Sequence, residues 1–248
     1  MISVIMAAYN AAATIEEAVK SVTAQTLKDW ELIIADDGST DKTFAIAAQL
    51  AAGDKRITVI KNEKNIGVSE TRLKAAEESH GEWIAILDSD DAWEPDKLSK
   101  ELLLAQKTGA ELIYTGSAFM DETGNRQDYI LHVPLEITHR ELLSQNLISN
   151  SSAMVKRDLY IENYAKGDRM HEDFAVWLNI LKKGHRACGI DEPLLIYRIS
   201  RGSKSGKKAR SAVMNWNTYR YTGLSLPQAL YYEIKYALNG IKKYRKLK

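Results

Sequence analysis

The sequence predicts an α/β protein whose core is a mostly parallel β-sheet flanked by helices, with a helical extension at the C-terminus. Short apolar runs of strand length alternate with segments of helical periodicity through the first hundred residues, and this alternation is typical of parallel strands joined by helices. Several strand runs end in turns rich in carboxylates. Ligands of open parallel sheets bind beyond the carboxyl ends of the strands, so these turns also predict the place of the functional site.

Strands and helices are expected to alternate in residues 1–110. The expected strands are residues 3–8, 30–35, 56–60 and 83–87. The expected helices are residues 14–25, 40–51, 68–79 and 95–107. Ser39 or Thr40 can cap the second helix, and Pro95 suits the first turn of the fourth helix.

The pattern loosens after residue 110. Further strands are expected at residues 111–115, 151–155 and 193–198, and a helix at residues 174–183 that Gly184 closes. Residues 117–134 have the polar turns of an irregular or antiparallel segment. Residues 200–208 are polar and contain glycine, which predicts a mobile loop.

Composition narrows the class of protein. The chain has 248 residues, of which 45% are hydrophobic and 27% are charged, as in ordinary globular proteins. The single cysteine, Cys188, excludes a disulfide framework and favours a reducing compartment. The N-terminus has no basic leader and no apolar run approaches the length of a membrane span. We therefore expect a cytoplasmic protein.

Charge is distributed unevenly along the chain. Residues 201–248 contain 12 Lys and Arg but one acidic residue, whereas the first 200 residues contain 22 basic and 32 acidic residues. This asymmetry indicates an acidic body with a basic tail that is attracted to an anionic surface. Anionic lipid and nucleic acid both meet that description.

Three carboxylates follow the strand at residues 83–87. Asp88, Asp90 and Asp91 stand within four residues, and their mutual repulsion predicts a neutralising cation. Hard divalent ions such as Mg²⁺ or Mn²⁺ prefer oxygen ligands of this kind. The alternative is an acidic turn that binds nothing.

Two further strand ends favour a nucleotide diphosphate as the ligand. Tyr9 follows the first strand and can stack on a base, and Asp37, which follows Asp36 at the end of the second strand, can accept a hydrogen bond from a base N–H. A divalent ion would bridge the clustered carboxylates and the diphosphate. The alternative for Tyr9 is a half-buried tyrosine that only completes the strand.

Four motifs carry a resemblance to a known family. They are VIMAAYN at residues 4–10, DDGSTD at 36–41, LDSDD at 87–91 and HED at 171–173. In this order and at these spacings the chain resembles glycosyltransferase family 2, inverting enzymes with the GT-A fold. The resemblance implies a GT-A catalytic domain in residues 1–205, with a nucleotide-sugar half at 1–110 and an acceptor half at 111–205. Residues 206–248 would form a basic amphipathic helical tail.

The resemblance also implies roles for individual residues. Asp173 matches the catalytic base, with Glu172 as the second candidate, and Asp90 matches the metal ligand, shared with Asp88. The implied nucleotide-binding residues are Ala7, Tyr9, Asp36, Asp37, Arg72, Asp88 and Ser89. The implied contacts to the donor diphosphate, from a segment that closes on it, are Arg198, Arg201 and Lys204. A surface linker is the alternative for that segment, and helix capping is the alternative for Asp173.

These residue types suit the chemistry of sugar transfer. A bound metal stabilises negative charge on the departing diphosphate, and a carboxylate removes the proton of the attacking hydroxyl. A single in-line displacement inverts the anomeric centre. The Gln-x-x-Arg-Trp signature and the membrane spans of processive relatives are absent from the sequence, so we expect one sugar to be added to each acceptor.

The last helix has an apolar stripe and a basic end. Apolar residues recur at intervals of three and four, at Leu230, Ile234, Ala237, Leu238, Ile241 and Tyr244. Such a helix with tyrosines and lysines is typical of a membrane-surface element. Binding to the inner face of the plasma membrane is expected, and nucleic-acid binding is not. The alternative is that the stripe packs on the catalytic body.

The sequence therefore predicts an inverting glycosyltransferase dependent on Mn²⁺ or Mg²⁺. It would move one sugar from a UDP-sugar to a saccharide or lipid-linked acceptor in the synthesis of a bacterial surface polysaccharide, such as lipopolysaccharide or capsule. A non-catalytic scaffold that binds sugar nucleotides is one alternative. A nucleotidyltransferase is another, although the loop at residues 8–12 lacks the basic, glycine-rich phosphate grip of that class.

Overall fold

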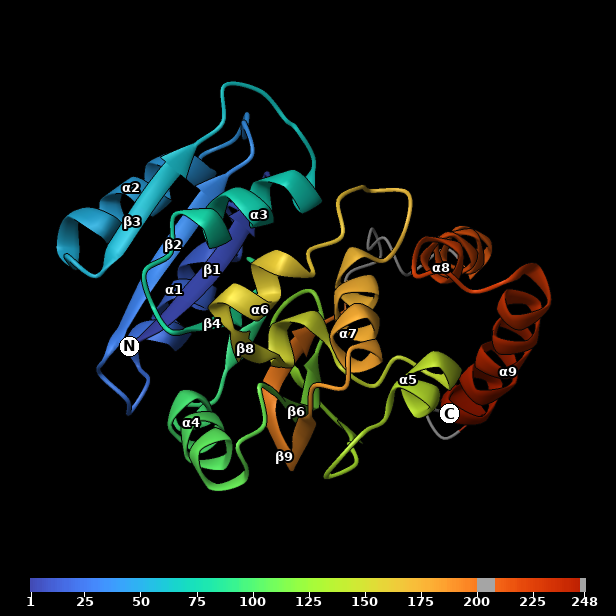
Figure 1. The fold of residues 1–248 in the computed structure, drawn as a ribbon. Coiled ribbons are helices and arrows are strands. Elements are labelled where there is room, and N and C mark those ends of the chain that lie inside the picture. The colour runs from blue at the N-terminus through green and yellow to red at the C-terminus, as the bar shows by residue number, and fades with distance from the viewer. Residues whose placement is uncertain (200–207, 246–248) are drawn as a thin grey trace.

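A computed structural model describes residues 1–199 and 208–245. In this part of the chain one mixed sheet of nine strands runs through the molecule, with helices on both faces and two C-terminal helices beside one end (Figure 1). The strand order is β3-β2-β1-β4-β8-β6-β9-β5, and β7 pairs with β6. The predicted α/β class with a helical C-terminal part is confirmed.

The first half of the sheet is parallel, as the alternating pattern predicts. Strands β2 and β4 flank β1, and β3 lies outside β2, all four in parallel. These strands are β1 (Ile2–Ala8), β2 (Trp30–Asp36), β3 (Ile57–Lys61) and β4 (Trp83–Ile86). The helices that connect them are α1 (Ile15–Thr23), α2 (Thr43–Gly53) and α3 (Val68–Glu77).

The second half of the sheet is mixed. Strand β8 lies between β4 and β6 and is antiparallel to both, whereas β9 is parallel to β6. Its strands are β5 (Ala92–Trp93), β6 (Leu112–Met120), β7 (Arg126–Leu131), β8 (Met154–Lys156) and β9 (Ala187–Arg198). Its helices are α4 (Lys97–Thr108), α5 (His139–Ser144), α6 (Arg157–Glu162) and α7 (Glu172–Lys182), with a 3-10 turn at Asn150–Ser152.

Strands β6 and β9 are longer than the sequence predicts. The segment at residues 117–134, predicted to be irregular or antiparallel, contains the antiparallel pairing of β6 with β7. Strand β9 continues through Pro193 instead of beginning there. The register shifts where Gly116 faces Pro193. A Cβ atom on Gly116 would lie 2.9 Å from the carbonyl oxygen of Glu192, so the glycine allows the close approach at this bulge.

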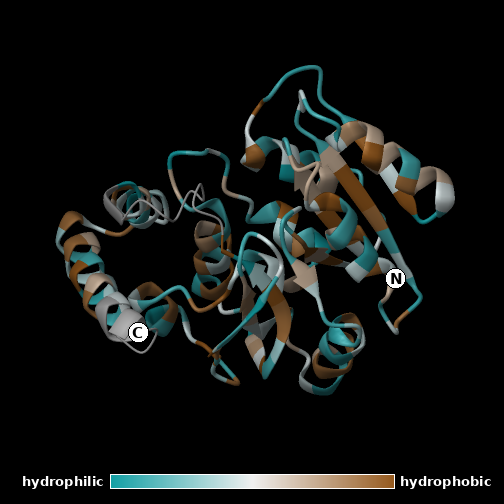
Figure 2. Ribbon diagram, turned by 180° about the vertical axis from the view of Figure 1, so that it is seen from behind, coloured by the Kyte–Doolittle hydropathy of each residue, from teal (hydrophilic) through white to brown (hydrophobic). Residues whose placement is uncertain are grey.

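Both faces of the parallel half are buried. Ile5 belongs to the core beneath α3 and α7, whereas its neighbours Val4 and Met6 belong to the core beneath α1 and α4. Successive side chains of a strand point to opposite faces, so a strand covered by helices on both sides is apolar throughout. Figure 2 shows this as hydrophobic colour along the central strands.

The C-terminal helices α8 (Lys208–Tyr221) and α9 (Leu226–Arg245) pack against the body near α5 and α7 (Figure 1). Tyr219 is fully buried, and its hydroxyl donates to the carbonyl of Leu143 across 2.7 Å. The tail predicted to be helical at residues 206–248 contains two helices in its described part. The predicted apolar stripe lies on α9, and α8 has no clear amphipathic pattern. Within the described residues, no helix is long and apolar enough to cross a membrane.

Candidate active site

The residues predicted to bind the donor lie at one edge of the sheet. Strands β1, β2 and β4 are adjacent and parallel, so the segments that follow them emerge at the same edge. Tyr9 follows β1, Asp36 ends β2, and the turn at residues 88–91 follows β4. The fold therefore brings together three of the motifs identified in the sequence.

The loops after β1 and β2 are tied to each other. Asn10 has a left-handed backbone, with φ of 50°, and its side-chain oxygen accepts a hydrogen bond from the Thr40 amide at 2.9 Å. Its own amide donates to the Ser39 hydroxyl at 3.0 Å. Tyr9, immediately before this link, is 50% exposed. Its ring is therefore accessible for stacking on a planar ligand. Ala7, also predicted to bind the nucleotide, lies two residues earlier in β1.

Asp37 is buried and organises the loop that leads into α3. Its carboxylate accepts hydrogen bonds from the amides of Ile66 at 2.8 Å and Gly67 at 3.0 Å, and from the Asn62 side chain at 3.1 Å. Asp36 accepts from the Ser39 amide at 3.2 Å, while its other oxygen is buried without a hydrogen-bond partner in the described structure. The predicted contact between Asp37 and a nucleobase stays a prediction.

A buried arginine joins the acidic turn to helix α7. Arg72 on α3 donates to Asp88 through Nη2 at 2.8 Å and to Glu172 through Nη1. Burial opposes its charge, but the two carboxylates outweigh burial and raise the pKa of Arg72. A second donor to Asp88 is the Asn150 side chain, at 3.1 Å. The predicted donor side and the predicted base side thus share one network.

Asp91 braces the acidic turn from within. It is buried, and it accepts hydrogen bonds from the Ser151 hydroxyl at 2.6 Å and from the Arg198 amide at 2.9 Å. Burial, followed by the charge of Asp90, raises the pKa of Asp91 well above its usual range. The Ser151 hydroxyl also accepts from the Asp88 amide at 3.1 Å. Asp91 therefore fixes the turn and does not face a ligand.

Asp90 differs from Asp88 and Asp91 because its carboxylate has no partner among the other described side chains and amides. No other residue in the described part of the chain donates a hydrogen bond to its carboxylate. Burial, with the charge of Asp88 as the second cause, raises the pKa of Asp90 to about 6. A nearby cation would relieve both effects. Ser89, between the two carboxylates, is half-buried.

The donor set suits a divalent ion that binds together with a diphosphate. Within residues 1–199 and 208–245, no cluster of three or more Asp, Glu, His or Cys side chains could hold a metal alone. Asp88 and Asp90 supply hard carboxylate oxygens, and Mg²⁺ at nucleotide sites commonly binds one or two carboxylates plus substrate phosphates. These residues therefore fit Mn²⁺ or Mg²⁺.

Arg198, predicted to contact phosphate, is engaged beneath the acidic turn. Its Nε donates to the Asp90 carbonyl at 2.8 Å, and its Nη2 pairs with Glu17 on α1 at 2.5 Å. A third donor, Nη1, reaches the Asp121 carbonyl at 3.3 Å. In this conformation the guanidinium supports the backbone of the turn. Arg201 and Lys204, and with them the predicted mobile loop, lie outside the described residues.

Asp173 lies in the first turn of α7, next to Glu172. Burial, with the charge of Glu172 as the second cause, raises the pKa of Asp173 to about 6. His171 and Arg72 act in the opposite direction. A carboxylate with a pKa near 6 is ionised at neutral pH and yet basic enough to accept a proton during a reaction.

Several supporting residues were not identified from the sequence. Asn150 and Ser151 hold Asp88 and Asp91, and the polar run at residues 149–152 before a buried strand was the available signal. Thr218 on α8 accepts a hydrogen bond from the His171 amide at 3.0 Å. No local signal marks that contact, because the two residues are 47 positions apart.

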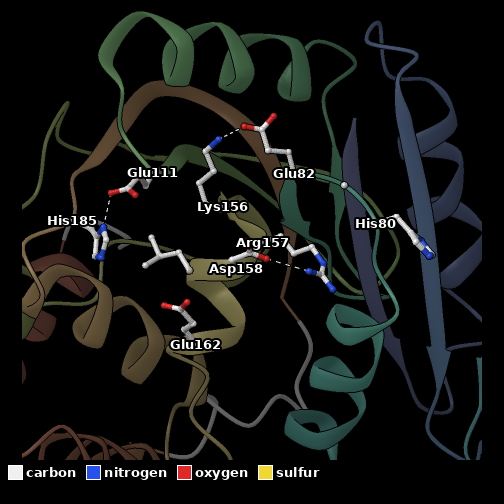
Figure 3. Close-up of a pocket in the computed structure, with 10 residues that line it drawn as sticks. His80, Glu82, Glu111, Lys156, Arg157, Asp158, Glu162 and His185 are labelled. Carbon is white, nitrogen blue, oxygen red and sulfur yellow. Dashed lines mark hydrogen bonds and ion pairs between the residues drawn. The ribbon is translucent and has the colours of Figure 1, made fainter.

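A surface hollow with a volume of about 620 Å³ lies at the opposite end of the sheet (Figure 3). Most of its charged groups are paired with each other, including Glu111 with His185 at 2.5 Å and Arg157 with Asp158 at 3.2 Å. Lys156 pairs with Glu82. It contains none of the predicted site residues.

Comparison with known proteins decides the family. Residues 3–162 match the model of the family described as Glycosyl transferase family 2. The chain belongs to glycosyltransferase family 2. The family 2 chain is therefore a glycosyltransferase, and the predicted family and enzyme class are confirmed.

Several relatives match this transferase over nearly its whole length. A Bacillus subtilis glycosyltransferase, TuaG, whose name assigns it to teichuronic acid biosynthesis, is 36% identical over 98% of this chain and 97% of its own. The Escherichia coli enzyme WfaP is 32% identical over 98% of this chain and 95% of its own. WfaP is named as a UDP-Glc:α-D-GlcNAc-diphosphoundecaprenol β-1,3-glucosyltransferase.

Two solved structures share the fold of this transferase. TarS residues 1–349 of S. aureus, in complex with UDP-GlcNAc, align with a TM-score of 0.74 at 17% identity over 92% of this chain and 69% of that chain. The Pyrobaculum calidifontis mannosyltransferase PcManGT, in complex with GDP-Man and Mn²⁺, aligns with a TM-score of 0.73 at 18% identity over 94% of this chain and 68% of that chain. At these identities the likeness concerns the GT-A fold alone.

Proposed function

We propose that this glycosyltransferase transfers a single sugar from a UDP-sugar to a lipid-linked saccharide, with inversion and with the help of Mn²⁺ or Mg²⁺. The observation that carries the proposal is the Arg72 network, because it joins the acidic turn to the turn that bears Asp173. The leaving group and the attacking hydroxyl must meet at one site. The network links Asp88, on the side of the leaving group, to Glu172, which neighbours the proposed base.

Residues 1–110 bind the donor in this proposal, and residues 111–205 bind the acceptor. Tyr9 stacks on the base, and Asp37 accepts a hydrogen bond from an N–H group on the edge of the base. Ala7 and Asp36 complete this part of the nucleotide site. Asp88 and Ser89 face the ribose, and Arg72 keeps Asp88 in place. The exposure of the Tyr9 ring and its position at the carboxyl edge of the sheet support this assignment.

Asp90 and Asp88 would hold the divalent ion. When bound, such an ion supplies Lewis-acid stabilisation of the charge that develops on the departing diphosphate. Asp91, Ser151 and Arg198 keep the backbone of the turn in one conformation. This preorganisation lets Asp88 and Asp90 meet the donor without rearrangement. Arg201 and Lys204 are proposed to contact the diphosphate.

Asp173 acts as the general base. The acceptor oxygen forms a bond to the anomeric carbon while its proton passes to the Asp173 carboxylate, and the bond from that carbon to the diphosphate oxygen breaks with its electron pair. Nucleoside diphosphate leaves on the opposite side. An α-linked donor therefore gives a β-linked product. The raised pKa of Asp173, about 6, supports this role over that of a helix cap.

The names of two relatives support the substrate classes. WfaP and WfgD of Escherichia coli are both named for UDP-Glc as the donor and a diphosphoundecaprenol-linked GlcNAc as the acceptor. We extend to this chain a UDP-sugar donor and a polyprenyl-diphosphate-linked acceptor for a bacterial surface polysaccharide. With such an acceptor, we propose that the enzyme works at the inner face of the plasma membrane, as a peripheral protein attached through its basic tail.

A donor screen tests the proposal. UDP, GDP and dTDP release would be measured from a panel of nucleotide sugars, with a GlcNAc-diphospholipid acceptor and with Mn²⁺, Mg²⁺ or EDTA. We expect UDP release that requires both the acceptor and a divalent ion. Binding of UDP without turnover on any acceptor would favour the scaffold alternative. Consumption of a nucleoside triphosphate with pyrophosphate release would favour a nucleotidyltransferase.

A further inference from the structure

Helix α9 carries an apolar stripe that the rest of the described protein leaves uncovered. Its members recur every four residues, with one tyrosine beside them, and are 54 to 61% exposed. They are Leu226, Leu230, Tyr231, Ile234 and Leu238. Residues four apart share one side of a helix. In Figure 2 hydrophobic and hydrophilic colour alternate along α9.

The opposite side of α9 attaches the helix to the catalytic body. Ala229 is fully buried, and the Tyr236 ring lies 6.2 Å from the Phe174 ring on α7, measured between centroids. The Asn239 side chain donates to the Ser144 carbonyl on α5 at 3.1 Å. Residues of the stripe predicted from the sequence, such as Leu230 and Ile234, therefore do not pack on the body. Ile241 and Tyr244 lie where side chains are not described.

The positive charge of the C-terminal region favours an anionic partner for the stripe. Residues 206–248 contain ten basic residues and one acidic residue, Glu233. Lys235 lies one turn after Tyr231 and borders the stripe, and the sequence after Leu238 ends in a basic run at residues 242–248. A second copy that packed through the same face would bring like charge against it. An anionic bilayer matches the apolar stripe, Lys235 beside it and the basic character of the sequence that follows.

The attachment of α9 also fixes the distance between this face and the catalytic turn. Helix α8 packs on α9 and holds the segment before Asp173: Thr218 accepts from the His171 amide at 3.0 Å, and Asn217 donates to the Arg169 carbonyl at 2.8 Å. A lipid-bound α9 would therefore hold the Asp173 turn at a defined height above the membrane surface.

We propose that the outward face of α9, formed by Leu226, Leu230, Tyr231, Ile234 and Leu238, inserts into the interface of an anionic lipid bilayer with the helix axis parallel to the membrane. The inference rests on the proposed position of the enzyme at the inner leaflet and names the surface that achieves it. Tyr231 lies beside the stripe, so its ring would reach the level of the headgroups, which amphipathic rings prefer.

Vesicle co-sedimentation tests this surface. The parent protein is expected to bind phosphatidylglycerol vesicles more tightly than phosphatidylcholine vesicles, and each basic residue near the surface should contribute about fivefold. Binding should weaken as salt is added. The triple variant Leu230→Ser, Ile234→Ser, Leu238→Ser should lose at least tenfold in affinity. Leu103→Ser removes a leucine on α4 that is 65% exposed, and this matched control should bind as the parent does.

Three outcomes would overturn the inference. The first is equal binding of the parent to both kinds of vesicle, and the second is unchanged binding of the triple variant. The third is a light-scattering result in which the parent and the Leu103→Ser control are dimers and the triple variant is a monomer. Thermal unfolding of each variant checks its fold. Transfer to a water-soluble acceptor separates the two proposals: a triple variant that keeps this activity but leaves the vesicles supports the inference. Vesicle binding that depends on the stripe, without sugar transfer by any variant, would reject only the proposed function.

Discussion

Arg72 and Glu172, 100 positions apart in the sequence, form a buried ion pair between α3 and α7. The same guanidinium pairs with Asp88. One cation therefore stabilises carboxylates from the donor side and from the helix that bears the proposed base. Without it, several acidic side chains would share a poorly hydrated region with little compensation.

Arg72→Met should lower the free energy of unfolding by about 3–5 kcal/mol, because it leaves buried carboxylates without their cation. Urea denaturation at pH 7 measures the loss. The double variant Arg72→Met, Glu172→Gln should recover part of it, because one of the stranded charges is then absent. Unchanged stability of Arg72→Met, or purely additive effects in the double-mutant cycle, would contradict the coupling.

The pH dependence of transfer should report the ionisation of Asp173. Burial and the charge of Glu172 raise the pKa of Asp173 to about 6. A general base must be deprotonated, so kcat/KM should fall as the pH decreases through about 6. Glu172→Gln removes the negative neighbour and should move this acidic limb to lower pH. An acidic limb near 4 in the parent, or one that Glu172→Gln moves upward, would argue against Asp173.

Asp173→Asn separates catalysis from stability. Turnover should fall by about 10²- to 10⁴-fold because the proton acceptor is lost, whereas UDP binding measured by calorimetry should persist. The raised pKa means that the native state binds this proton more tightly than the unfolded chain. Stability contributed by the protonated form is therefore lost as the pH rises from about 4 to about 6. At pH 8 the variant should unfold at a temperature no lower than the parent, and a clear decrease would assign Asp173 a structural role.

Replacement of Asp90 by alanine should affect metal-dependent binding, whereas replacement of Asp91 should affect stability. Asp90→Ala should abolish the dependence of UDP binding on Mn²⁺ and leave thermal stability nearly unchanged, because no other described residue donates a hydrogen bond to its carboxylate. Asp91→Ala leaves the Ser151 hydroxyl and the Arg198 amide without their acceptor, at about 1–3 kcal/mol for each buried donor. Thermal unfolding and calorimetry with and without Mn²⁺ distinguish the two. Equal losses of stability would contradict the division.

The parallel half of the fold was predictable from the sequence because its information is local. Each strand is an apolar run bounded by turns, and the helices between them have regular spacing. The extent of β9 was not predictable in this way, because Pro193 argues for a boundary. The strand continues only because Gly116, far away in the sequence, allows a bulge opposite that proline.

The site was predicted in part for the same reason. The motifs at the strand ends predicted that Asp88 and Asp90 lie in one turn at the carboxyl edge of the sheet, and the structure has them there. Their role as ligand-facing residues stays a prediction. The support of the turn, however, depends on partners remote in sequence. Glu17 pairs with Arg198 across 181 positions, and an acidic residue in the first turn of a helix gives no sign of such a partner. The stripe on α9 was also visible in the sequence, but which face remains free depends on where Tyr236 packs.

The anomeric configuration of the product tests the central claim most directly. A UDP-sugar with an α linkage would be transferred to a soluble diphosphate-linked GlcNAc acceptor, and the anomeric proton coupling of the new linkage would be measured by NMR. A single displacement with Asp173 as the base predicts a β linkage. An α linkage in the product would contradict the account.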